Sequence, residues 1–142
     1  MRRITAIALL AAAGTLGAAN ALAQDCAVRA NMPFDFTVGN KLLPAGSYTI
    51  TRVHNDLIEL DNWDKRASAM STSLPDSYEA TNNRPVLVFD KYGGKYFLRE
   101  VRGGFSGMNF DLPLSKSEER LRTSKALAVN HSQVSITASE GN

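Results

Sequence analysis

The residues of this sequence that could do chemistry gather around two neighbouring polar turns. Four of them are carboxylates, and carboxylate oxygens are the ligands that calcium prefers: Asp56, Glu59, Asp61 and Asp64. Their spacing differs from the twelve-residue loop of an EF-hand, and acidic residues at turns also serve the hydrogen bonds of the turn itself. A carboxylate pair for glycoside hydrolysis could be drawn from the same set, but any chain with 14 acidic residues offers such pairs. We therefore predict no metal site and no cofactor.

Histidine and cysteine are too few for a typical zinc site. The chain has one cysteine, Cys26, and two histidines, His54 and His131, which are far apart in the sequence. We expect each histidine to be a solvated turn or tail residue. Nucleophile-elbow, zinc-protease, P-loop and dinucleotide-binding motifs are absent from the sequence. The sequence therefore predicts no catalytic residue, and a small hydrolase with an unrecognised site stays open as an alternative.

Cys26 lies close to the predicted start of the exported chain. An odd cysteine in an oxidising compartment indicates either an intermolecular disulfide or a free thiol. The sequence leaves both open, together with a thiol that has no role.

Three aromatic residues are candidates for contacts with a ligand: Trp63, Phe105 and Phe110. Trp63 stands between polar turn residues. An exposed ring there would be a platform for a sugar or a peptide, but we expect the ring to fold over the end of a sheet and cap the core. Phe105 and Phe110 belong to the glycine-rich stretch GGFSGMNF. Such loops often carry binding, and they also serve as long connections into a helix.

The first 23 residues have the composition of a secretory signal peptide. A basic start, Arg2-Arg3, precedes an apolar stretch rich in Ala and Gly, which ends in the cleavage sequence Ala21-Leu22-Ala23. We predict cleavage after Ala23 and export to the periplasm, the cell surface or the medium. Cleavage removes two basic residues, so 16 basic and 14 acidic residues become 14 of each. A neutral chain without a basic block gives no electrostatic footprint for nucleic acid, and we expect no transmembrane segment in it.

Alternating apolar and polar residues predict one β-rich domain over residues 24–128. Six strands are indicated, and eight if both ends contribute: 28–32, 34–38, 47–53, 57–60, 66–74, 86–92, 95–101 and 134–136. Short strands joined by turns are typical of a small antiparallel β-sandwich or barrel. Residues 129–142 form a polar tail, either a last edge strand or disordered.

Two segments of this domain allow finer predictions. Gly93-Gly94 can supply both positive φ values of a type I′ turn, which places Val88 opposite Arg99 in a hairpin with apolar residues on both faces. The stretch SKSEERLRTSKAL predicts the one C-terminal helix, with Ser115 as its N-cap and Glu118 at the spacing of a capping box. Because the apolar stripe of this helix is narrow, the helix must dock on the sheet.

Three stretches together resemble a family of small exported bacterial proteins of unknown function: PFDFTVGNKLLPAGSYTI, VLVFDKYGGKYFLREV and LPLSKSEER. Members of the family share a PFxF strand, an LPAGxY turn and a KYGxxYFL hairpin. The resemblance covers residues 28–125 and implies export and a β-rich domain. It brings no catalytic or binding residue to carry over.

The favoured prediction is a non-enzymatic exported domain that binds a protein or a glycan, or that serves the cell envelope structurally. Such a domain should expose an aromatic or apolar patch. The first alternative is a subunit of an assembly, in which residues 25–32 or 134–137 add a strand to a neighbour, or Cys26 locks a dimer. The second alternative, the hydrolase, requires a concave pocket where the acids or His54 converge.

Overall fold

The computed structural model describes residues 27–75, 84–104, 107–124 and 131–141. The strands are β1 (Ala27–Met32), β2 (Phe36–Val38), β3 (Lys41–Leu43), β4 (Gly46–His54), β5 (Leu57–Asn62), β6 (Ala67–Thr72), β7 (Leu74–Pro75), β8 (Val86–Tyr92), β9 (Lys95–Arg102), β10 (Asn109–Asp111), β11 (His131–Thr137) and β12 (Ser139–Gly141). The helix α1 spans Lys116–Thr123. The predicted signal peptide, its cleavage at Ala23, and Cys26 lie outside the described residues.

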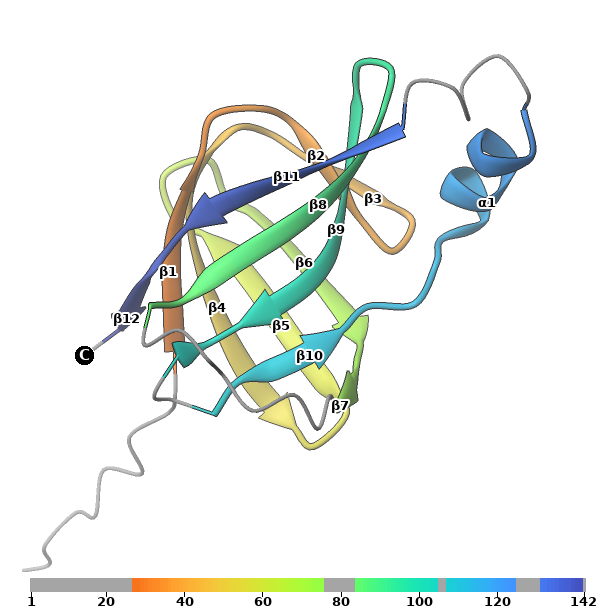
Figure 1. The fold of residues 1–142 in the computed structure, drawn as a ribbon. Coiled ribbons are helices and arrows are strands. Elements are labelled where there is room, and N and C mark those ends of the chain that lie inside the picture. Colours follow the sequence, from red (N-terminus) through yellow and green to blue (C-terminus); the bar gives the residue numbers. More distant parts are fainter. Residues whose placement is uncertain (1–26, 76–83, 105–106, 125–130, 142) are drawn as a thin grey trace, which may run out of the picture.

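The strands form two sheets that face each other (Figure 1). Sheet A has five strands in the order β12-β1-β4-β5-β6. Sheet B has seven strands: β11-β8-β9-β10-β7, with β2 beside β9 and β3 beside β2. All neighbours are antiparallel except β2 and β9, which make one parallel contact at Thr37 and Phe97. The prediction of a mainly antiparallel β-sandwich with one C-terminal helix is confirmed.

The two sheets are joined at two corners where one strand runs into the next. At the first corner, Ser73 links β6 of sheet A to β7 of sheet B, and its amide donates to the Asp56 carbonyl at 2.7 Å. At the second, Ala138 links β11 of sheet B to β12 of sheet A, and its amide donates to the Pro85 carbonyl at 2.8 Å. The described residues of the C-terminal tail therefore form the strands β11 and β12. A last edge strand was one of the two expectations for residues 129–142.

The core fills the space between the sheets with alternate residues of each strand, as the period of a half-buried strand requires. Its centre is aromatic, because Phe36 lies edge-to-face with Tyr48 at 5.1 Å and with Phe89 at 5.4 Å between ring centroids. Edge-to-face packing places the positive edge of one ring on the negative face of the next.

The PFxF and LPAGxY motifs are joined by structural contacts. The Ala45 amide donates to Asp35 Oδ1 at 2.7 Å, and the Tyr48 hydroxyl donates to the Pro44 carbonyl at 2.7 Å. Gly46 has φ +151°, and a Cβ at this position would lie 2.6 Å from Asn62 Nδ2. Only glycine adopts this positive φ and leaves room for Asn62 without strain. These motif residues therefore build the strand-to-strand connection.

The β8–β9 hairpin keeps the expected register from Phe89 to Tyr92 and is shifted by one residue from Val86 to Val88. A β-bulge between Val88 and Phe89 sets Val88 opposite Glu100 instead of Arg99. Val101 consequently pairs with Leu87 and enters the core, where both are fully buried, although the sequence put them on opposite faces. The type I′ turn is also wrong, because only Gly93 of the glycine pair has a positive φ.

The described residues contain no helix that is long and apolar enough to cross a membrane.

Candidate functional site

The outer face of sheet B carries a buried ionic network centred on Arg99. The three nitrogens of its guanidinium group each have a partner. Nε donates to Asp90 Oδ2 at 3.0 Å, Nη1 donates to the Leu112 carbonyl at 2.7 Å, and Nη2 donates to the Glu118 carboxylate. Arg99 therefore connects a strand, a loop and a helix.

The same network docks α1 on the sheet. Arg99 follows the buried Leu98 and faces outward from β9, and the Ser115 hydroxyl accepts the Glu118 amide at 3.1 Å as the N-cap. The side chain of Glu118 is only 2% exposed and binds Arg99, rather than pairing with Arg122 along the helix. The helix is thus held by a charged anchor instead of an apolar stripe.

Burial and hydrogen bonding act in opposite directions on the two acids. Burial would raise the pKa of Asp90, but hydrogen bonds from Arg99, Gln133 and His131 outweigh it and hold that pKa below its usual value. Burial raises the pKa of Glu118, although Arg99 works in the other direction. Asp90 is therefore the firmly ionised member of the network.

A hollow of about 430 Å³ lies beside this network. Gln133 Nε2 donates to Asp90 Oδ1 at 3.2 Å, and His131 Nε2 lies 3.3 Å from the same oxygen. The His131 ring stacks on Tyr92 with 4.8 Å between centroids. The His131 side chain is 41% exposed, as expected of a solvated histidine, but it belongs to β11 and contacts both Asp90 and Tyr92. A carboxylate that holds a histidine makes up two of the three residues of a catalytic triad. The third residue is a nucleophile, and no serine, threonine or cysteine is among the described residues that line this hollow.

The acidic residues singled out in the sequence do not converge. Glu59 and Asp61 project outward from β5, where they alternate with buried residues. Asp56 and Asp64 are exposed in the turns at either end of β5, and His54 is exposed at the end of β4. Within the described ranges, no group of three acids, histidines or cysteines could hold a metal ion.

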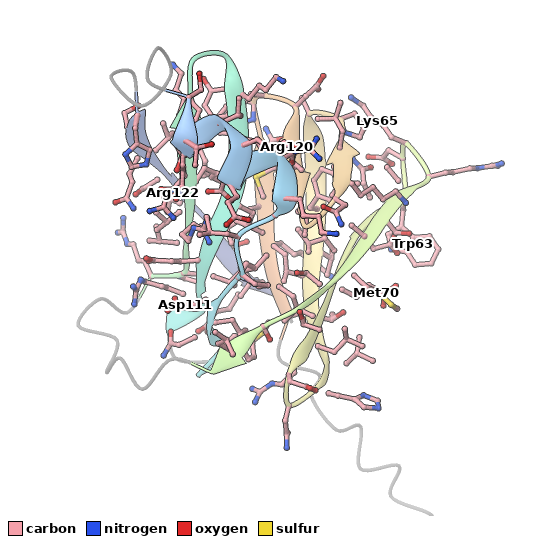
Figure 2. All side chains as sticks on the ribbon, turned by 90° about the vertical axis from the view of Figure 1, so that its right-hand side faces the viewer. Trp63, Lys65, Met70, Asp111, Arg120 and Arg122 are labelled. Atoms are coloured by element: carbon pink, nitrogen blue, oxygen red, sulfur yellow. The ribbon has the colours of Figure 1, made fainter. Side chains whose placement is uncertain are left out.

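The three aromatic candidates have different positions. The Trp63 side chain is 81% exposed in the β5–β6 turn, so the expectation that it caps the core is wrong. Figure 2 shows Trp63 and Met70 projecting from the same margin of the molecule. Phe110 is a core residue of β10 rather than a loop contact, with the Arg52 guanidinium 5.5 Å from its ring centroid. Phe105 lies outside the described residues.

The strand β6 is the last of sheet A and pairs, among the described residues, with β5 alone. The Ser73 amide donates to the Asp56 carbonyl, so Ser73 and Asp56 are a hydrogen-bonded pair next to the β5–β6 ladder. Hydrogen-bonded and non-hydrogen-bonded pairs alternate along an antiparallel ladder. The backbone N–H and C=O groups of Ser68, Met70 and Thr72 therefore point away from β5. The sequence of β6, ASAMST, contains neither a charged residue nor proline, which are the usual protections of an edge strand.

A groove of about 590 Å³ borders this free edge. Its floor includes Ala69–Thr72, one wall is the β2–β3 turn, and the other is the segment that leads into α1. Lys41 and Lys116 line opposite walls. Sequence reasoning missed this groove, because nothing in ASAMST shows which strand ends a sheet.

A second groove, of about 470 Å³, lies on the other side of the β2–β3 hairpin, between α1 and the β8–β9 turn. It shares none of its lining residues with the first groove.

No protein-family model, no curated protein and no solved structure matches this chain.

Proposed function

We propose that this protein is a non-enzymatic, exported binding domain that takes up an extended segment of a partner protein along β6. The proposal rests on one observation: β6 offers an uncharged, unpaired edge to a groove. Strand addition uses the main-chain groups of such an edge for affinity and neighbouring side-chain contacts for specificity.

The walls of the groove favour a single extended segment over the edge of a second globular subunit. The free stretch, Ala67–Thr72, is six residues long and is bounded by the corner at Ser73. Met70 is 58% exposed beside it. An acidic residue in the partner would complement Lys41 and Lys116. The partner is therefore an extended, mainly uncharged segment with an acid at one side.

The other functions considered from the sequence have less support. β1 lies between β4 and β12, so the described residues 27–32 pair on both sides within the chain. β11 ends sheet B and pairs, among the described residues, with β8 alone, so strand addition at residues 134–137 stays an alternative. The acids expected to converge in a hydrolase are spread over the outside of sheet A. Export and membership of the family of small exported bacterial proteins stay part of the proposal.

A selection from random dodecapeptides displayed on phage tests the function, with the purified exported protein as target. Selected peptides should bind with one-to-one stoichiometry in calorimetry. Met70→Pro removes a backbone donor that faces the groove, and it should weaken binding by at least about tenfold.

Met70→Thr is the matched control, because it changes the same side chain and leaves the amide in place. It should retain most of the affinity. The proposal fails if no peptide is selected, or if Met70→Pro binds the selected peptides as well as the unmodified protein does.

A further inference from the structure

The groove between α1 and the two hairpins combines an apolar floor with a cationic rim. Tyr96 of β9 lies at the floor, its neighbour Phe97 is only 3% exposed, and Leu42 and Leu121 close the groove from β3 and α1. Leu42 pairs with Thr37 across the hairpin, and its side chain is 67% exposed. Apolar side chains are thus presented to solvent from three separate elements.

The floor is rigid because its central ring is held from behind. Tyr96 stacks on Phe34 with 3.8 Å between centroids and 9° between the ring planes, and Lys91 Nζ lies 5.4 Å from the centroid of the Tyr96 ring. Phe34 in turn lies edge-to-face with the core residue Phe89 at 5.3 Å. A preformed apolar surface of this kind loses little conformational entropy when a ligand covers it.

Two cations line this groove, one from each of two elements. Lys95 comes from the β8–β9 turn, and Arg120 comes from α1, as Figure 2 shows for Arg120. Both side chains are exposed, and neither forms an ion pair within the part of the chain that the structure describes. The one acid in the groove, Asp35, already accepts the Ala45 amide at 2.7 Å.

We infer that this groove binds a free long-chain carboxylate. The alkyl chain would cover the floor, and the carboxylate would lie between Lys95 and Arg120. A volume of about 470 Å³ is in the range of small-molecule sites. A neutral amphiphile would leave both cations without a partner, and a cationic amphiphile would meet repulsion from them.

Calorimetry and methyl NMR of the exported protein test the inference with dodecanoate below its micellar concentration. We expect saturable one-to-one binding, with shifts confined to the Leu42 and Leu121 methyl groups and the neighbouring aromatic rings. Dodecyl maltoside has the same chain without the charge, and acetate has the charge without the chain. Both should bind at least about tenfold more weakly.

Three variants at exposed positions locate the site. The double variant Lys95→Glu/Arg120→Glu should weaken dodecanoate binding by about tenfold or more, and Leu42→Ser by about fivefold. Arg66→Glu reverses one positive charge on the β5–β6 turn, outside the groove, and should leave binding unchanged. The inference is overturned if dodecanoate does not bind, if the maltoside binds equally well, or if the double variant binds normally. Because the two grooves share no lining residue, none of these results bears on peptide binding at β6.

Discussion

The outer faces of the two sheets are used in different ways. On sheet B, an ionic network around Arg99 holds α1 against β8 and β9. Sheet A has no such cover within the described residues, and its last strand keeps one backbone edge free. Burying charge makes the first face sensitive to any change that leaves one charge without its partner. Exposed residues of sheet A can be substituted without such a loss of stability, which is what a binding surface requires.

Removing the central cation should have the largest effect. Arg99→Met leaves Asp90 and Glu118 buried without a counter-charge, and we expect the free energy of unfolding to fall by about 3–5 kcal/mol. Chemical denaturation measures this. The triple variant Asp90→Leu/Arg99→Met/Glu118→Leu removes all three charges and should recover most of the loss. Equal instability of the two variants would show that shape, rather than charge pairing, holds this face.

The N-cap of α1 should contribute less. In Ser115→Ala the Glu118 amide loses its acceptor, and we expect a loss of about 1 kcal/mol in thermal or chemical unfolding. Ser117→Ala is the comparison: the Ser117 hydroxyl lies 3.0 Å from Ser115 Oγ but accepts no helix amide among the described residues, so we expect it to change stability by less than half as much. A loss as large as that of Arg99→Met would mean that the cap, and not the network, docks the helix.

The network also predicts how stability depends on pH. The pKa of Asp90 is lower in the folded state than in the unfolded state, so its contribution is complete above the unfolded value of about 4. That contribution is lost as the pH falls through the folded pKa. The raised pKa of Glu118 acts in the opposite direction. Asp90→Asn should therefore flatten the fall in stability in acid, as measured by denaturation at pH 2 to 6. An unchanged slope would contradict the role given to Asp90.

The sequence anticipated the strands better than the surfaces. Alternation predicts β4, β5 and the β8–β9 hairpin, because each strand buries every second residue in the same core. The bulge that brings Val101 into the core leaves no local signal, since neither glycine nor proline stands beside it. Glu118 is recognisable as a capping-box residue, but its partner is 19 positions away. The sequence neighbours of Trp63 predict a ring that caps the core. The exposure of the ring depends on the direction in which the β5–β6 turn projects.

Changes on the open side should have the smallest effect on stability. Trp63→Ala removes an exposed ring, and we expect the free energy of unfolding to change by no more than about 0.5 kcal/mol. The same variant should weaken the binding of selected peptides if the ring contacts them beyond the end of β6. A large loss of stability would mean that the ring packs against the domain.

Amide hydrogen exchange along β6, followed by NMR with and without a selected peptide, tests the central claim most directly. In the free protein, the amides of Ala69 and Ser71 should be protected by β5, while those of Ser68, Met70 and Thr72 exchange quickly. The peptide should slow exchange at these three positions. Uniform protection along β6 in the free protein, or no change on adding a bound peptide, would contradict the account.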